Sequence, residues 1–154
     1  MESILYEGIV YWAYDYEITN MNYAERYFIR HLSFSAPLSK HKGSFYLTSN
    51  SIIIEGNDNA LTIKLTNISQ LYLGYDDVYS SSSAKNFGLF WKPLRIALKD
   101  ETIIYLVVDY KNGFSQNGTI FELLKELCWI QIKAISLMMK NLLLFILSIS
   151  SLYG

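Results

Sequence analysis

The feature that most constrains this fold is an alternation of apolar and polar side chains with a period of two residues. It runs through most of the chain from Ile29 to Asp109, and the clearest stretch is "ALTIKLT" at residues 60–66. Every second side chain of a β-strand points to the same face, whereas a helix repeats every 3.6 residues. The alternation therefore predicts strands with one buried face, here carrying Leu61, Ile63 and Leu65.

Short turns separate these strand-like segments. "GNDNA" (residues 56–60) and "KDET" (residues 99–102) contain residue types that favour tight turns. Many short strands with close turns predict an antiparallel sandwich or barrel. The expected strands are 8–17, 31–36, 44–48, 51–56, 60–66, 71–75, 93–99 and 102–110.

One helix start is marked near Thr119. The Thr119 hydroxyl and the Glu122 carboxylate have the spacing of a capping box, directly before an apolar run. We expect this helix to lay its apolar stripe over the open end of the sheet. The stripe consists of Ile120, Leu123, Leu124, Leu127 and Ile130.

The C-terminal tail changes in character. After Glu126 the only charges are Lys133 and Lys140, and residues 141–154 carry none. A membrane-spanning helix needs about 20 apolar residues, which is reached only by starting at Ala134 and including Lys140. Four interpretations stay open: a packed or oligomer-forming helix, an interfacial or membrane-anchoring segment, a disordered or strand-like tail, and an altered C-terminus such as a shifted reading frame.

Composition and motifs exclude several classes of function. The net charge is −1 and no long basic run exists, which argues against nucleic acid as a partner. The single cysteine, Cys128, permits no intrachain disulfide, and the first residues lack the basic region of a signal peptide. We therefore expect a cytoplasmic protein, either membrane-associated or not bound to a membrane.

Catalytic and metal-binding patterns are missing from the sequence. His31 and His41 have no acidic residue or cysteine at metal-ligand spacing. Cys128 lies in an apolar stretch, and no nucleophile elbow, phosphate loop or dinucleotide-binding turn occurs. We therefore expect no catalysis, no metal and no cofactor.

Two groups of residues are candidates for contact with a lipid or a partner protein. Lys40, His41 and Lys42 form a small basic group in the loop before the 43–56 hairpin. In the long loop 76–92, three aromatic side chains could either insert into a membrane or partner, or fold back to close one end of the barrel. These three are Phe87, Phe90 and Trp91.

The order of these pieces resembles the pleckstrin-homology superfold and, within it, the GRAM-type domain. "GSFYLTSNSIIIEG" (residues 43–56) resembles the GRAM hairpin, "LTIKLTNISQLYLGY" (61–75) the following strand, and "KPLRIALKDETIIYLVV" (92–108) the next hairpin. The positions that carry the resemblance are Gly43, Leu47, Thr48, Ile63, Leu65 and Ile68.

This resemblance implies a domain at residues 28–130, preceded by a strand and short helix at 1–27 and followed by the apolar tail at 131–154. It implies a barrel or sandwich capped by the Thr119 helix, with a binding or scaffold role. Phosphoinositide-binding members carry basic residues on both sides of the first turn, whereas strand 44–48 has none.

We expect a non-catalytic binding module of unknown partner. The alternatives are a peripheral membrane or lipid-binding domain that uses the tail and the Lys40/Lys42 loop, and a carrier of small apolar ligands.

Overall fold

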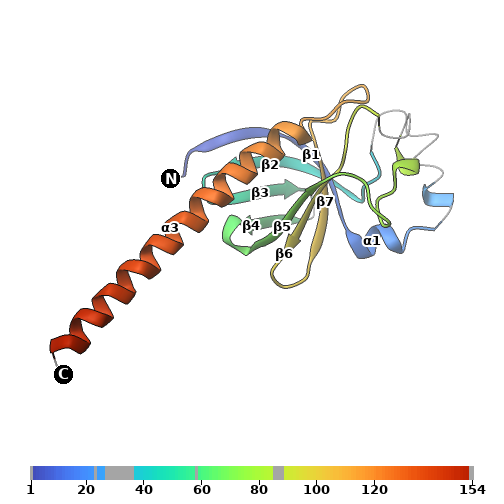
Figure 1. Ribbon diagram of the computed structural model, residues 1–154. Helices are drawn as coiled ribbons and strands as arrows, with labels where there is room; N and C mark the ends of the chain where they lie inside the picture. The colour runs from blue at the N-terminus through green and yellow to red at the C-terminus, as the bar shows by residue number, and fades with distance from the viewer. Residues whose placement is uncertain (1, 23, 27–36, 58, 85–88, 153–154) are drawn as a thin grey trace.

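The computed structural model describes residues 2–22, 24–26, 37–57, 59–84 and 89–152 and contains one antiparallel sheet of seven strands, curled into a half-barrel (Figure 1). The order in the sheet is β4-β3-β2-β1-β7-β6-β5. The predicted mainly β fold with a C-terminal helix is confirmed, while expected strand 31–36 lies outside the described residues. The strands are β1 (Ile4–Tyr14), β2 (His41–Thr48), β3 (Ser51–Gly56), β4 (Ala60–Lys64), β5 (Ile68–Leu73), β6 (Leu94–Leu98) and β7 (Ile103–Val108).

Strand β1 lies at the centre of the sheet. It pairs with β2 on one side, with Gly8 opposite Phe45, and with β7 on the other, with Val10 opposite Val108. Trp12 is buried on the inner face, and Ala13 is buried on the outer face. The expected division at residues 27/28 assigned this strand to an extension, whereas it is part of the sheet because it pairs with a neighbouring strand along both of its edges.

The inner face of the half-barrel holds the main core. Ile63 and Leu65 from the β4 region pack there with Leu94 and Ile96 of β6, as the alternation predicted. Burial of such aliphatic side chains contributes roughly 1.5–3 kcal/mol each. The other buried members are Val10, Trp12, Phe45, Leu47, Ile52, Ile54, Ile104, Leu106, Val108, Ile120 and Leu124.

A second apolar cluster covers the outer face of β1 and β7. Helix α1 (Asp15–Thr19) contributes Ile18, and the long loop after β5 contributes Tyr79 and Trp91. The Asp76 carboxylate holds this loop, because it accepts hydrogen bonds from the Tyr79 backbone N–H at 2.8 Å and from the Tyr105 hydroxyl at 2.7 Å. The loop, which also contains the short 3-10 turn η2 (Ser81–Ser83), is therefore a second layer on the sheet.

Helix α3 (Asn117–Leu152) begins two residues before the expected start at Thr119. The buried Asn117 amide accepts a hydrogen bond from the Val108 N–H at 2.8 Å and donates to the carbonyl oxygens of Leu106 and Lys92 at 2.9 and 2.7 Å. The Thr119 hydroxyl instead donates to the Gln116 side chain at 3.3 Å. The capping-box prediction was wrong because these tertiary bonds, which local spacing does not reveal, fix the helix start.

The N-terminal part of α3 closes the half-barrel, and its C-terminal part leaves the domain. The helix contacts β5, β7 and the 3-10 turn η1 (Leu65–Asn67). At 1.5 Å per residue its 36 residues extend about 54 Å. Figure 1 shows that it continues well past the sheet as an isolated helix.

Candidate functional site

The basic residues Lys40, His41 and Lys42 lie together at the beginning of β2, where a small pocket opens. The pocket has a volume of about 210 Å³ and lies between this strand end, the β3–β4 turn and β1. The turn contributes Gly56, Asn57 and Asn59, and β1 contributes Trp12. This grouping of the basic residues with an amide-bearing turn makes the pocket a candidate binding site for a polar ligand.

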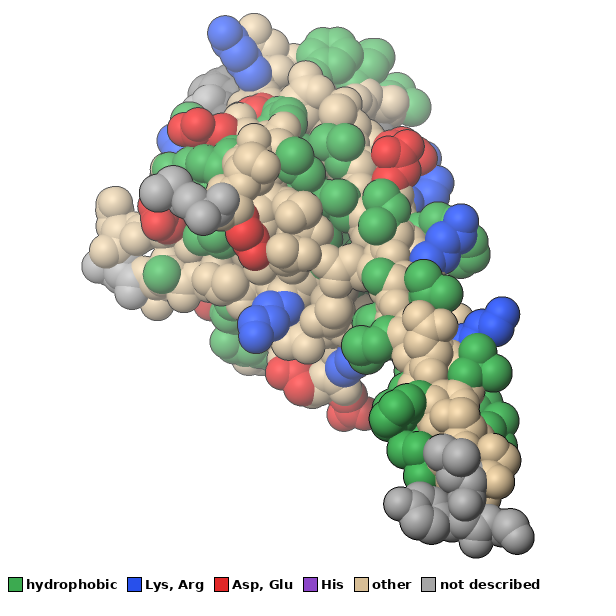
Figure 2. Space-filling view, turned by 90° about the vertical axis from the view of Figure 1, so that its left-hand side faces the viewer, with side chains coloured by type: hydrophobic (Ala, Val, Ile, Leu, Met, Phe, Trp, Pro, Cys, Tyr) green, Lys and Arg blue, Asp and Glu red, His purple; other side chains and the backbone are tan. Residues whose placement is uncertain are grey.

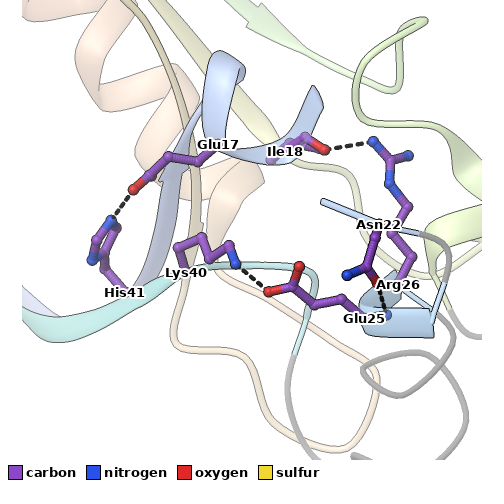
Figure 3. Close-up of polar contacts among 7 residues, drawn as sticks. All are labelled: Glu17, Ile18, Asn22, Glu25, Arg26, Lys40 and His41. Atoms are coloured by element: carbon purple, nitrogen blue, oxygen red, sulfur yellow. Dashed lines mark hydrogen bonds and ion pairs between the residues drawn. The ribbon is translucent and has the colours of Figure 1, made fainter. Parts of the chain in front are cut away.

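Two of the three basic side chains are paired with carboxylates. The Nε2 atom of His41 lies 2.7 Å from Oε1 of Glu17 on α1, and the Lys40 ammonium pairs with the Glu25 carboxylate (Figure 3). The Lys42 ammonium lies 5.1 Å from the centroid of the Tyr11 ring. Because two carboxylates face the cations, the pocket is less attractive to highly charged anions than its sequence suggests.

Trp12 contributes an aromatic ring to the lining of the pocket. Its ring stacks against the His41 imidazole with centroids 4.3 Å apart and an interplanar angle of 30°. Within the described part of the chain, the Trp12 Nε1 atom has no hydrogen-bond partner although the residue is 2% exposed. A buried N–H without a hydrogen-bond partner costs free energy in the folded state.

The aromatic residues of the long loop do not act as one group. Phe90 is 56% exposed and contacts Phe114 at a centroid distance of 5.5 Å. Trp91 is buried among the tyrosines of the outer cluster, where it packs on Tyr79 at 6.2 Å. Phe87 lies outside the described residues. Trp91 therefore folds back onto the outer face of the sheet and is not available for insertion into a membrane.

The buried titratable groups lie in surroundings that suit a structural role. Burial raises the pKa of Tyr79, whose hydroxyl donates to the Leu38 carbonyl oxygen at 2.9 Å. Burial also raises the pKa of the Cys128 thiol, which keeps it protonated and poorly nucleophilic. The predicted inward-facing residues Ile63, Leu65, Leu94 and Ile96 are packed together in the core of the half-barrel, where a carrier of small apolar ligands would need an open interior.

The largest exposed apolar surface belongs to the second half of α3. Each residue from Ile132 to Ser151 is exposed, including Leu143, Phe145 and Leu147. Figure 2 shows apolar side chains along this part of the helix where it leaves the domain. By length and composition α3 could cross a membrane, with an 18-residue window of mean hydropathy 1.8 that is not buried by the protein. The strand-like interpretation of the tail is therefore wrong, because residues 117–152 form one helix.

Sequence reasoning identified the basic residues of the pocket and missed the groups that surround them. Trp12 and Glu17 were assigned to a strand in a separate extension, and "GNDNA" was interpreted only as a turn. An alternating "VYWAY" segment, apolar on both faces, was the available signal that β1 is central.

No family model matches the chain, and no curated protein matches it. Among solved structures it is similar to the C-terminal domain of an unknown protein from Leishmania infantum. The two share 10% sequence identity with a TM-score of 0.50, over 83% of this chain and 85% of that one. At this identity the likeness concerns the fold alone.

Proposed function

We propose that this protein is a non-catalytic binding module of pleckstrin-homology or GRAM-like type that is attached to a membrane by the C-terminal half of α3. The observation that carries this proposal is the exposure of a predominantly apolar helix segment from Ile132 onward. Exposed apolar surface of this extent on a water-soluble domain normally marks an interaction site.

The segment suits a bilayer better than a groove on a partner protein. Lys133 and Lys140 are seven residues apart and share one side of the helix, while large apolar side chains occupy the other sides. A partner helix would cover only one stripe, whereas lipid surrounds the whole helix. From Lys133 to Leu152 the helix extends roughly 28 Å, close to the ~30 Å hydrocarbon thickness of a bilayer.

The polar groups of the segment are compatible with lipid. The Ser148, Ser150 and Ser151 hydroxyls donate hydrogen bonds to backbone carbonyl oxygens three residues earlier, at 2.7, 2.9 and 2.8 Å. A hydroxyl paired in this way does not bring an unsatisfied donor into the hydrocarbon. Lys140 has a long side chain that can reach back toward the headgroups.

The order of elements supports the domain part of the proposal. The β2–β3 hairpin, strands β4 and β5, the β6–β7 hairpin and helix α3 follow one another along the chain in the order that the pleckstrin-homology resemblance implies. The pocket at Lys40 and His41 then serves as the ligand site of the module. Because Lys40 and His41 are already paired with the carboxylates of Glu25 and Glu17, we propose a ligand with hydrogen-bond acceptor atoms and low charge.

Flotation of the full chain with phosphatidylcholine vesicles tests the attachment. We expect the wild-type protein to float with the vesicles and the variant Leu143→Glu with Ile146→Glu to stay behind, because each buried carboxylate costs a few kcal/mol in the bilayer. The matched control is Phe90→Glu with Phe114→Glu, which adds the same charge at equally exposed apolar positions on the domain. This control should float like the wild type.

Two outcomes would contradict the proposal. Equal flotation of the Leu143/Ile146 variant would show that the helix segment is not the attachment. The second outcome is a wild-type protein that does not float and sediments as a dimer, while the Leu143/Ile146 variant sediments as a monomer. That result would mean that the segment serves self-association.

A further inference from the structure

Resting on the membrane attachment proposed above, we infer that the β2–β3 end of the sheet faces the lipid headgroups and that the Lys40–His41–Lys42 pocket faces away into the aqueous phase. The pocket then takes a water-soluble ligand with acceptor atoms. A headgroup of the membrane that holds α3 is excluded as its ligand. Three features support this orientation: the direction of α3, the side chains at the point where it leaves the domain, and the position of the pocket.

The direction of α3 is fixed at two points. Asn117 holds its first turn to β7 through the three hydrogen bonds described above. Fourteen residues later, Gln131 donates from Nε2 to the Ser49 carbonyl oxygen at 3.1 Å and to Oδ1 of Asn50 at 2.9 Å, both in the β2–β3 turn. A helix is stiff over this length, so the exposed segment continues away from the domain at the β2–β3 end.

The residues at this exit have the character of a membrane boundary. Trp129 is 58% exposed, and the Lys133 ammonium lies 5.1 Å from the centroid of its ring, one helical turn further on. Tryptophan and lysine are enriched where a helix enters the headgroup layer, because an amphipathic ring and a long cationic side chain suit both media. The wholly exposed apolar segment follows directly, which places the membrane surface near Trp129 and the β2–β3 turn.

The pocket lies at the opposite end of the same strands. His41 begins β2 and Thr48 ends it, so about 23 Å of strand separate the pocket from the β2–β3 turn. Gly56, at the other end of β3, lines the pocket as well. In Figure 1 the tail of α3 extends on the side of the N-terminus, and β3 points the other way. The headgroup layer is only about 5–8 Å thick, so it does not reach the pocket.

Fluorescence quenching by brominated lipids tests this orientation, because the chain holds three tryptophans in suitable places. Trp12 lines the pocket, Trp91 is buried under the outer cluster, and Trp129 lies at the exit of α3. In vesicles with bromine near the headgroup end of the acyl chains, the full-length protein should lose roughly a third of its emission, the share of one tryptophan in three. The Trp129→Phe variant should lose none, and the control Trp91→Phe should still be quenched.

Flotation of the same samples separates the two proposals. A Trp129→Phe variant that floats and is still quenched would mean that the pocket end faces the bilayer, which overturns the orientation and leaves the attachment standing. A floating wild-type protein that brominated lipid does not quench would also overturn it. A wild-type protein that does not float removes the attachment and the orientation together.

Discussion

The two halves of α3 are both rich in large apolar residues, yet their surroundings are opposite. Ile120 and Leu124 in the first half are fully buried against the half-barrel, whereas Leu143 and Leu147 in the second half are exposed. Apolar content alone therefore does not decide which part of this helix joins the core.

The difference lies in the arrangement of charges around the helix. In the first half, Glu122, Lys125 and Glu126 occupy the face opposite the apolar stripe, as in a helix that lies on a protein surface. In the second half, Lys133 and Lys140 are the only charged side chains. The first half has one wet and one dry side, whereas the second half exposes its apolar side chains, as the proposed membrane attachment requires.

Substitution of one leucine in each half should give the largest contrast. Leu124→Ala leaves a cavity in a core that does not collapse completely, and we expect a loss of about 2–5 kcal/mol in the free energy of unfolding. Leu143→Ala removes a side chain that contacts no other element, and we expect less than about 0.5 kcal/mol. Urea unfolding of both variants without lipid, followed by tryptophan fluorescence, measures the difference. Similar losses would mean that the second half is packed against protein in solution.

The two asparagines of α3 offer a second contrast, of intermediate size. Asn117→Ala leaves the Val108 N–H and two carbonyl oxygens without their partner in a buried site, which should cost about 1–3 kcal/mol. Asn141→Ala is the matched control in the exposed half and should stay within about 0.5 kcal/mol of the wild type. The same urea experiment applies, and an Asn117 variant as stable as the control would show that the helix start is held by apolar packing alone.

The local periodicity of the sequence predicted the positions of the strands of the half-barrel, with errors at their ends: residues 15–17 are helical, and β5 begins at Ile68 instead of the expected Leu71. Ile63 and Leu65 in the β4 region and Leu94 and Ile96 on β6 are buried as the alternation required. Such alternation is a direct consequence of one wet and one dry face of a sheet. Local alternation could not predict the pairing of β1 between β2 and β7, because the paired residues are far apart in the sequence, for example Gly8 with Phe45 and Val10 with Val108.

The candidate pocket could be predicted only in part for the same reason. Lys40, His41 and Lys42 are neighbours in the sequence and were visible as a basic group. Their compensation by Glu17 and Glu25, and the contribution of Trp12, depend on how the chain returns to β2 after β1. Local patterns contain no information on such distant contacts, which decide how strongly the basic group attracts an anion.

The smallest expected effect concerns the junction between the two halves of α3, where Gln131 contacts the β2–β3 turn. The Glu2 carboxylate supports this turn, since it accepts hydrogen bonds from the Thr48 hydroxyl at 2.7 Å and from the Asn50 side chain at 2.8 Å. These bonds lower the pKa of Glu2 below its ordinary value of 4.5. A lowered folded-state pKa contributes stability that is present above the unfolded value and is lost as the pH falls through the folded one.

Glu2→Gln removes this titration without changing the size of the side chain. We expect the variant to be slightly less stable than the wild type at pH 7, and the difference in urea midpoint to shrink as the pH falls from 7 to 3. Glu7→Gln removes the same charge from an exposed position on β1 and serves as the control. If the Glu2 and Glu7 variants respond to pH alike, net charge rather than the Glu2 hydrogen bonds governs the acid response. In that case Gln131 would have only its own bonds to the β2–β3 turn to hold the exposed half of α3 in its direction.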